Sequence, residues 1–283
     1  MSAMILDGRV VARAMRADTR QAAERVTAQR GRSPALAVLH PTDDAAARSY
    51  VRALVRAATD VGITCRIVPL AADTTRAQVL AQLAQLNGDP QIDGIMVQTP
   101  LPVGCDAAEV SRAVAASKDV DGVSPWNAGE LSHGRAALLP ATPAGGMALL
   151  RHYQIPLVGR HAVVIGRSAV VGRPMALLLS HAHATVTLAH SRTANLAALV
   201  RCADIVVSAT GRAGIITGEM VRPGAVVVDF GINVLADGTI VGDVDFAAVS
   251  THAAAITPVP GGTGPMTTAI VLQQVVDAAA GAA

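Results

Sequence analysis

Hydrophobic and polar residues alternate along the first part of the chain in a way that predicts helices and buried strands in turn. Apolar side chains recur at helical spacing between Asp7 and Arg30, and Asp7 is a suitable N-terminal cap for that helix. Short apolar runs follow, separated by longer amphipathic segments. The predicted strands cover residues 35–39, 64–69 and 94–98, and the predicted helices cover about 44–60 and 75–86. This alternation is typical of parallel βαβ units.

A second series of the same kind follows a loop-rich stretch at 122–146, which contains many glycines and prolines and is expected to be a linker. Its first strand, 161–165, runs into Gly166 and then into a helix expected over 174–180. Further strands are predicted at 185–189, 205–209, 225–230 and 255–257. Two series of this type predict an α/β protein of two domains with a cleft between them.

Composition narrows the class of protein. The 283 residues are 51% hydrophobic and 16% charged, which indicates a globular core. A net charge of +2 and an aromatic content of 2% argue against nucleic-acid binding. Three separated cysteines, and the lack of a signal peptide pattern or a long apolar run, favour a cytoplasmic protein that binds no membrane. His181 and His183 lack nearby acids or cysteines, so no metal site is expected.

The turn after the first strand of the second series could hold a phosphate group. Gly166 and Gly172 permit close approach of the backbone, and the following helix would present its free N–H groups to an anion. The spacing G-x-S-x-x-x-G differs from the usual dinucleotide fingerprint. Glycine at such a junction is equally consistent with ordinary turn chemistry.

The next predicted strand favours NADP over NAD. Sites selective for NAD place an acid about 20 residues beyond the glycine turn, where it binds the ribose hydroxyl. Here no acid occurs between Gly166 and Asp204, and the strand ends in His190-Ser191-Arg192-Thr193. Hydroxyl and guanidinium groups at that position suit a 2′-phosphate. The alternative is a solvated polar strand end.

Six blocks along the chain resemble the bifunctional methylenetetrahydrofolate dehydrogenase/methenyltetrahydrofolate cyclohydrolase (FolD) family. They occur in the family's order and extend over nearly the whole sequence. The blocks are Gln98-Thr99-Pro100-Leu101-Pro102, Lys118-Asp119-Val120-Asp121-Gly122, Gly166-Arg167-Ser168 through Val171-Gly172-Arg173-Pro174, His190-Ser191-Arg192-Thr193, Val241-Gly242-Asp243-Val244-Asp245-Phe246, and Thr257-Pro258-Val259-Pro260-Gly261-Gly262-Thr263-Gly264-Pro265-Met266.

The resemblance implies a fold, a reaction and an assembly. An N-terminal α/β catalytic domain over 1–139, completed by a C-terminal helix over 265–283, would bind folate. A Rossmann-like domain over 140–264 would bind NADP, and the protein would be a homodimer. The implied reaction belongs to one-carbon metabolism: oxidation of 5,10-methylenetetrahydrofolate to the methenyl form, followed by hydrolysis to 10-formyltetrahydrofolate.

The resemblance also assigns roles to individual residues. Asp121 would bind the pterin ring, Gln98 would line the reaction centre, and Tyr50 would pack against the folate. The wall of the folate site would include Pro260, Gly261 and Gly264. The residues expected to bind NADP are Gly166, Arg167, Ser168, Gly172, Ser191, Arg192 and Ile232.

One departure from the family decides the expected mechanism. The family's catalytic tyrosine is followed four residues later by lysine, whereas Tyr50 here is followed by Leu54. Positions i and i+4 share a helix face, so both side chains point toward the reaction centre. All but one of the 23 basic residues are arginine, so neutral drift would have supplied arginine. Arg52 and Arg56 lie two positions away, rotated by about 200°, and cannot replace the amine.

The missing amine affects the two half-reactions differently. Hydrolysis needs a positioned group to move protons, which typically contributes about 10²–10⁴-fold to the rate. Hydride transfer depends mainly on positioning. We therefore expect dehydrogenase activity to persist and cyclohydrolase activity to be weak or lost, as in family members that lack this lysine.

Two other readings stay open at this point. Thr99 and Thr263 replace the apolar residues usual in the family, and a buried hydroxyl needs a partner either in the pocket or in the ligand. A different or modified substrate would supply such a partner. A catalytically silent paralogue that binds folate or nucleotide is the third reading.

Asp243 and Asp245 are expected to form structural hydrogen bonds rather than an acid–base pair.

Overall fold

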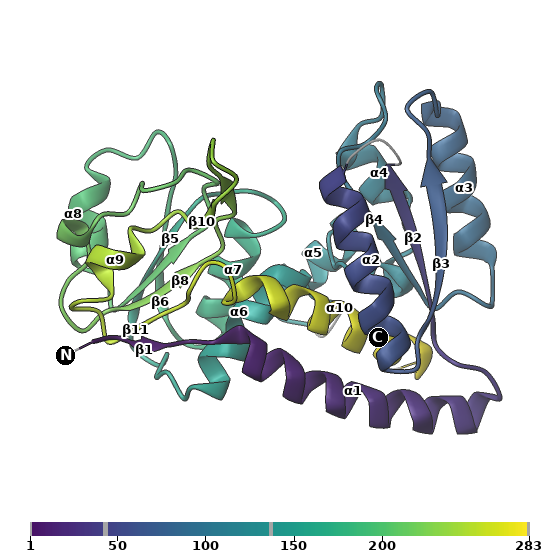
Figure 1. Ribbon diagram of the computed structural model, residues 1–283, viewed down its shortest axis with the longest axis horizontal. Coiled ribbons are helices and arrows are strands. Elements are labelled where there is room, and N and C mark those ends of the chain that lie inside the picture. Colours follow the sequence, from purple (N-terminus) through teal and green to yellow (C-terminus); the bar gives the residue numbers. More distant parts are fainter. Residues whose placement is uncertain (1, 42–44, 136–137, 282–283) are drawn as a thin grey trace. The chain divides into compact units, whose positions relative to one another are not determined.

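The computed structural model describes residues 2–41, 45–135 and 138–281, and the chain divides into two compact units. The six-stranded unit comprises Met1–Arg13 and Thr142–Thr267, and the three-stranded unit comprises Ala14–Ala141 and Thr268–Ala283 (Figure 1). Helices α1 (Gly8–Arg30) and α10 (Thr263–Ala279) each continue from one unit into the other.

The three-stranded unit is built on a parallel sheet in the order β3-β2-β4. Its strands are β2 (Ala35–Pro41), β3 (Thr64–Leu70) and β4 (Gly94–Val97). The crossover helices are α2 (Ala45–Asp60) and α3 (Arg76–Gly88). Helix α3 begins with a capping box in which the Thr75 hydroxyl accepts from the Gln78 N–H and the Gln78 side chain accepts from the Thr75 N–H.

The central strand β2 is buried along its whole length because both of its faces are covered. Ala35, Ala37 and Leu39 face an apolar cluster that includes Val79 and Leu83 of α3. Helix α2 packs against β2 and β3. Successive side chains of a strand point to opposite faces, so the residues between those three face α2.

The segment after β4 carries the predicted acidic block and is held by a buried amide. Helices α4 (Ala107–Ala113), η1 (Ala116–Lys118) and α5 (Pro125–Ser132) surround it. Gln274 of α10 donates to the carbonyls of Val120 and Leu139, at 2.8 and 2.9 Å, and accepts from the Leu139 N–H at 2.6 Å. This one side chain therefore fixes the backbone next to Asp121.

The six-stranded unit contains a wholly parallel sheet in the order β1-β11-β8-β7-β5-β6. Its strands are β1 (Met4–Ile5), β5 (His161–Ile165), β6 (Thr185–Ala189), β7 (Ile205–Ser208), β8 (Val226–Asp229) and β11 (Ala255–Ile256). The other elements are α6 (Ala141–His152), α7 (Gly172–His181), α8 (Leu196–Arg201), η2 (Gly218–Met220), α9 (Phe246–Val249) and the antiparallel pair β9 (Asn233–Val234) and β10 (Ile240–Val241).

Both faces of this sheet are buried, which explains its continuous runs of valine and isoleucine. Val163, Val206 and Val227 belong to one apolar cluster, and their neighbours Val164 and Val207 belong to a second cluster. A parallel sheet covered on both faces is the doubly wound arrangement of Rossmann-like domains. The predicted two-domain α/β fold is therefore confirmed.

The prediction that residues 122–146 form a loop-rich linker is wrong. Helix α5 begins there because Ser124 caps it and Pro125 occupies its first position. Gly145 and Gly146 lie inside α6, where added side chains would press on Met266 and Phe230. These glycines allow close packing of a helix rather than a flexible connection.

The division of the chain differs in detail from the expected domains 1–139 and 140–264. The change from one unit to the other falls between Ala141 and Thr142, close to the expected boundary. Met1–Arg13 go with the six-stranded unit, because β1 pairs with β11 and the Leu6 N–H donates to the Ile256 carbonyl. No helix among the described ranges is long and apolar enough to cross a membrane.

Replacing Gln274 by leucine should destabilise the three-stranded unit by about 2–4 kcal/mol, because three backbone groups lose a buried partner. Urea unfolding followed by the fluorescence of Trp126, the chain's sole tryptophan, measures this loss. Gln273→Ala, at the adjacent exposed position, is the matched control and should cost no more than about 1 kcal/mol, because it loses only the hydrogen bond to Asp277. Equal stability of the two variants would contradict the bridging role of Gln274.

Candidate functional site

The three-stranded unit buries a tyrosine hydroxyl that lacks a hydrogen-bond partner. Tyr50 lies on α2, and its oxygen is inaccessible to water without a partner of good geometry among the described residues. Burial raises the pKa of Tyr50, the nearby Thr268 hydroxyl lowers it, and the charge of Asp121 raises it further. The structure thus brings Tyr50 and Asp121 together, and it adds Thr268. A buried polar group without a partner is a place where a ligand can bind.

The carboxyl group of Asp121 has no hydrogen-bond donor beside it to offset its burial. Its side chain is partly buried and makes no hydrogen bond within the described part of the chain. Burial, together with the neighbouring charge of Asp119, raises the pKa of Asp121 from 3.8 to about 6. A carboxylate held this way binds N–H donors strongly, because it has no competing partner in the protein.

Asp119, two residues earlier, has the opposite character. Its carboxylate accepts hydrogen bonds from the backbone N–H groups of Val123 and Ser124 and from the Asn127 amide, at 3.2, 2.7 and 2.9 Å. These bonds hold the turn that leads into α5. Of the two acids in the block, Asp119 is therefore structural, and Asp121 is available to a ligand.

Leu54 occupies the helix face that carries Tyr50, and its side chain is only 1% exposed. No basic group contributes to the pKa of Tyr50 or Asp121. The chain's only lysine, Lys118, is turned away, because it donates to the carbonyls of Leu86 and Asp89 at 3.0 and 2.7 Å. Among the described residues of this unit, the groups that act on the Tyr50 phenol are the Thr268 hydroxyl and the Asp121 carboxyl group, and no amine is among them.

Gln98 follows the last residue of β4, and its N–H donates to the Leu39 carbonyl of β2 at 2.8 Å. Its side chain is half-buried and makes no hydrogen bond among the residues described. Thr99 beside it is exposed. The Thr99 hydroxyl is therefore free to bind water and needs no polar partner in a ligand.

The six-stranded unit forms a cradle at the point where its strand order reverses. The chain passes from β5 outward to β6 and then returns to β7 on the other side of β5. Parallel sheets bind ligands at the carboxyl ends of the strands beside such a reversal. Gly166, directly after β5, has a φ of 116°, and a side chain there would overlap the Ala209 carbonyl after β7. A side chain on Gly172 would overlap the Gly166 carbonyl.

Ser168 closes the cradle. Its hydroxyl oxygen accepts from the backbone N–H groups of Val171 and Gly172, at 3.1 and 3.2 Å, at the beginning of α7. The hydroxyl proton remains free to donate to an anion. Arg167, one residue earlier, is exposed and has no hydrogen bond or ion pair in the described ranges.

Ser191 and Arg192 lie at the same edge of the sheet, because β5 and β6 pair in register from His161–Thr185 to Ile165–Ala189. Both residues are exposed, and their turn is closed by bonds from the Arg192 N–H to His190 and from the His190 N–H to Thr193. The Arg192 guanidinium has no partner among the residues that the structure describes. This arrangement fits the predicted contact with a 2′-phosphate.

The remaining predicted residues also lie in the six-stranded unit. Ile232 follows β8 and is 66% exposed, so its side chain is open to a ligand. Gly261 has a φ of 107° and accepts from the Gly8 N–H through its carbonyl at 2.9 Å. Pro260 precedes it in the same loop, and open space surrounds the α-carbon of Gly264.

Three polar residues that drew attention in the sequence are structural. The Thr263 hydroxyl donates to the Asp229 carbonyl at 2.9 Å, so its partner lies in the protein and not in a ligand. Asp243 accepts from the hydroxyls of Ser208 and Thr210, at 3.0 and 2.9 Å. Asp245 caps α9. The expectation that these two acids form structural hydrogen bonds is confirmed.

Thr268 was not identified from the sequence. It lies two residues beyond the glycine- and proline-rich block that ends at Met266, on the part of α10 that belongs to the three-stranded unit. Its proximity to Tyr50 joins residues far apart in the sequence. The only local signal was the continuation of the block into a threonine pair.

Two family models match the chain. The tetrahydrofolate dehydrogenase/cyclohydrolase catalytic domain matches residues 6–121, and the tetrahydrofolate dehydrogenase/cyclohydrolase NAD(P)-binding domain matches residues 140–283. Bifunctional protein FolD from Roseiflexus sp. (strain RS-1) is 52% identical over 279 residues, which cover 99% of this chain and 97% of that protein.

Two solved structures show the same fold at lower identity. The bifunctional enzyme FolD from Campylobacter jejuni has a TM-score of 0.96 and 39% identity, with 99% of each chain covered. The Trypanosoma brucei methylenetetrahydrofolate dehydrogenase-cyclohydrolase, solved with NADP cofactor and inhibitor, has a TM-score of 0.94 and 34% identity, with 99% of this chain and 98% of that chain covered.

Replacing Asp121 by asparagine should stabilise the protein at neutral pH. Because its pKa rises to about 6 on folding, ionisation disfavours the folded state, and the penalty grows as the pH rises from about 4 to about 6. The variant should therefore match the parent near pH 4 and exceed it by about 2–3 kcal/mol above pH 7. Urea unfolding at both pH values tests this. Asp119→Asn, as control, should be destabilising at neutral pH, and a destabilised Asp121→Asn would refute the assignment.

Proposed function

Because the chain belongs to the tetrahydrofolate dehydrogenase/cyclohydrolase family, we propose that it oxidises 5,10-methylenetetrahydrofolate to the 5,10-methenyl form with NADP as oxidant. The observation that carries this proposal is the complete nucleotide cradle at the strand reversal. Gly166 and Gly172 leave space that side chains would fill, and Ser168 and Arg192 offer unpaired donors around it.

The three-stranded unit would hold the folate. The Asp121 carboxylate would accept hydrogen bonds from the N–H groups of the pterin ring, which carries several donors and needs an acceptor that the protein has not already occupied. Tyr50 would pack against the folate and give its hydroxyl the partner that it lacks in the protein. Gln98, with a free amide at the end of β4, would line the reaction centre.

The six-stranded unit would hold NADP, which accepts the hydride when bound. The backbone around Gly166 and the N-terminal end of α7 would bind the phosphates that join the two nucleotide halves. Arg192 and Ser191 would bind the 2′-phosphate, and exposed Ile232 would contact a ring of the cofactor. Hydride transfer then requires only that this unit and the folate-binding unit place the two reacting carbons together.

Water addition to the methenyl bridge is the step that this pocket supports poorly. The attacking water must lose a proton and a ring nitrogen must gain one. Tyr50 is protonated at neutral pH, as any phenol is, and burial raises its pKa further, so it does not act as a base. Leu54 has no proton to exchange, and the two arginines nearest in sequence lie on another face of α2. We propose that cyclohydrolase activity is weak or absent.

The two rival functions have less support. A changed substrate was suggested by Thr263, but that hydroxyl has its partner in Asp229. A silent paralogue would have no reason to retain the strain-relieving glycine at Gly166 or the unpaired carboxyl group of Asp121.

We also propose a homodimer in the cytoplasm, on the family resemblance alone, and light scattering of the purified chain would test the dimer.

The purified protein should reduce NADP with methylenetetrahydrofolate while hydrolysing methenyltetrahydrofolate at least about 100-fold more slowly than a family member that has the lysine. Leu54→Lys should raise the rate of hydrolysis by about 10²-fold or more, because it returns a titratable amine to the face of Tyr50. Absorbance of NADPH and of the methenyl chromophore follows both reactions.

Leu54→Met is the matched control, because it fills the same buried space without an amine and should leave both rates unchanged. The lysine variant should be less stable, since position 54 is 1% exposed, so both rates are measured below its unfolding temperature. Rapid hydrolysis by the unmodified protein would refute the proposed loss. Absence of NADPH formation would refute the dehydrogenase assignment.

Arg192→Ala should weaken NADP binding by about 10–100-fold and leave NAD binding unchanged, because only NADP carries the phosphate that the guanidinium contacts. Calorimetric titration with each dinucleotide measures the difference. Arg160→Ala removes the same charge from an exposed position just before β5, at the opposite edge of the sheet, and should affect neither affinity. Equal loss of both dinucleotides in Arg192→Ala would contradict the proposed contact.

A further inference from the structure

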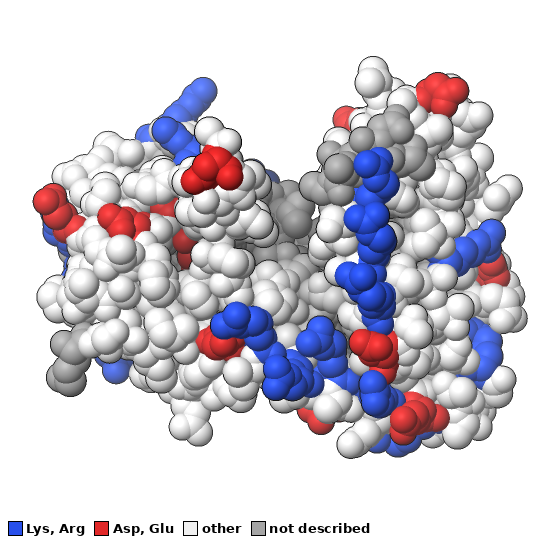
Figure 2. Space-filling view, in the orientation of Figure 1, with Lys and Arg blue, Asp and Glu red and all other residues white. Residues whose placement is uncertain are grey.

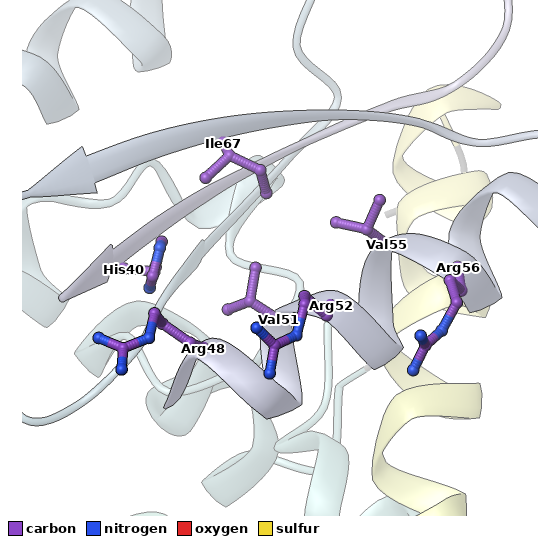
Figure 3. A pocket seen from close by; sticks show the side chains of 7 residues that line it. All are labelled: His40, Arg48, Val51, Arg52, Val55, Arg56 and Ile67. Atoms are coloured by element: carbon purple, nitrogen blue, oxygen red, sulfur yellow. The ribbon is translucent and has the colours of Figure 1, made fainter. Parts of the chain in front are cut away.

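Charged side chains of the described residues lie mostly at the surface, as the basic side chains over α1 and α2 illustrate (Figure 2). On α2 these are exposed arginines, which extend beside a groove that Figure 3 shows: Arg48, Arg52 and Arg56. Four acids are the exception, since each is at most 7% exposed: Asp93, Asp119, Asp229 and Asp243. A buried carboxylate is unfavourable unless other groups satisfy it, so each of the four needs partners.

The two buried acids of the three-stranded unit have local partners. Asp93 forms ion pairs with Arg30 and Arg32, at 2.8 and 2.7 Å. Asp119 holds the turn before α5. Asp229 and Asp243 belong to the six-stranded unit, and among the described residues no arginine or lysine side chain pairs with either. Their partners lie instead in the segments that follow β7 and β8.

The Asp243 carboxylate gathers the backbone of the loop that follows β7. It accepts from three successive N–H groups, at 2.7, 3.2 and 2.9 Å, which are those of Thr210, Gly211 and Arg212. In a trans peptide the carbonyl points away from the N–H group of the same plane, so the first of these bonds turns the Ala209 carbonyl away from Asp243. That carbonyl lies against Gly166, where it would overlap any side chain. Asp243 therefore fixes one wall of the glycine turn.

Asp243 and Asp229 also hold the residues on both sides of Ile232. The Asn233 amide donates to Asp243 at 3.1 Å, and the Gly231 N–H donates to Asp229 at 2.7 Å. A side chain on Gly231 would overlap the Asp243 carboxylate, so glycine is required there. Ile232 lies between these two anchored residues and is 66% exposed. Two buried acids thus hold an apolar side chain outward at the carboxyl end of β8.

Hydrogen bonds keep Asp243 ionised despite its burial. Burial alone would raise the pKa of Asp243, but hydrogen bonds from Thr210 and Asn233, among others, outweigh burial and hold the pKa below its usual value of 3.8. Hydrogen bonds to a charged group are about twice as strong as those between neutral groups. The loop after β7 and the turn at Ile232 are therefore held by a charge that an amide at the same position cannot supply.

Given the proposed use of NADP, on which this inference rests, we propose that Asp243 is a positioning residue of the nucleotide cradle. Its side chain is 0% exposed, so it does not touch the cofactor, and it holds the 210–212 loop and the Ile232 turn where they bind the nicotinamide half of NADP. The strands lie in the order β8, β7, β5 and β6. With the 2′-phosphate at the turn after β6 and the linking phosphates at the turn after β5, the nicotinamide half reaches the ends of β7 and β8.

Asp243→Asn tests this role, because asparagine has nearly the same shape and no charge. We expect calorimetric titration to show NADP binding at least about tenfold weaker than in the parent. The affinity for adenosine 2′,5′-bisphosphate, the half of NADP that Arg192 would contact, should change less than about twofold, whereas a general structural defect would weaken both ligands. Asp245→Asn is the matched control, because asparagine caps a helix as well as aspartate does and both affinities should stay unchanged.

Asn233→Ala keeps the test valid if the Asp243 variant does not fold. It removes one hydrogen bond to Asp243, and it should weaken NADP binding about 3–10-fold and leave binding of the bisphosphate unchanged. Ser208→Ala is its control, because it removes a bond of 3.0 Å to the same carboxylate from within β7 and should change neither affinity.

Unchanged NADP affinity in Asn233→Ala would overturn the positioning role, as would equal weakening of NADP and the bisphosphate, or equal effects of Asn233→Ala and Ser208→Ala. The proposed function would survive each of these results, because the parent still binds NADP. Failure of the parent to bind NADP would refute the proposed cofactor and this inference together.

Discussion

The register of parallel strands is the constraint on which both predicted binding regions depend. In each sheet every strand ends at the same edge, so loops far apart in the sequence meet there. Pairing of Ile165 with Ala189 brings the glycine turn beside the serine–arginine turn, and the bond from the Gly166 N–H to Ala189 fixes the distance between them. A shift of one residue would turn the buried valines of β5 to the wrong faces. The hydrophobic pattern of the strands therefore positions the cradle.

The strands and the glycine turn after β5 were predictable from the sequence, whereas the contacts that explain individual side chains were not. Strands β5 and β6 have the predicted bounds: β5 is a buried apolar run, and β6, an edge strand, is rich in residues that favour strands. Helix α6 was missed, because Gly145 and Gly146 suggest a loop when their neighbours are unknown. They occur where a helix packs closely, which only the three-dimensional arrangement reveals.

The same limit applies to the polar residues of the site. The resemblance singled out Asp121, but the block contains two acids, and only their hydrogen bonds separate a turn-forming carboxylate from a free one. In the sequence, the Thr263 hydroxyl suggested a changed substrate. In the structure it donates to a backbone carbonyl, so it needs no partner in a ligand. Local sequence identifies which residue types are present. Whether a hydroxyl or carboxyl group is already satisfied depends on segments distant in the chain.

Helix α2 has two faces of different composition, and the difference has a physical cause on each face. A chain that uses arginine for almost every cation would place arginine wherever charge alone matters, and the outer face of α2 follows that habit. The inner face does not, because position 54 is buried and a guanidinium would neither fit nor exchange protons. Leucine there adds about 1.5–3 kcal/mol of hydrophobic burial in place of an amine that would have to be desolvated. On the proposed mechanism, leucine at this position would leave Tyr50 without a proton carrier beside it, which would favour a reaction that depends on position over one that depends on proton transfer.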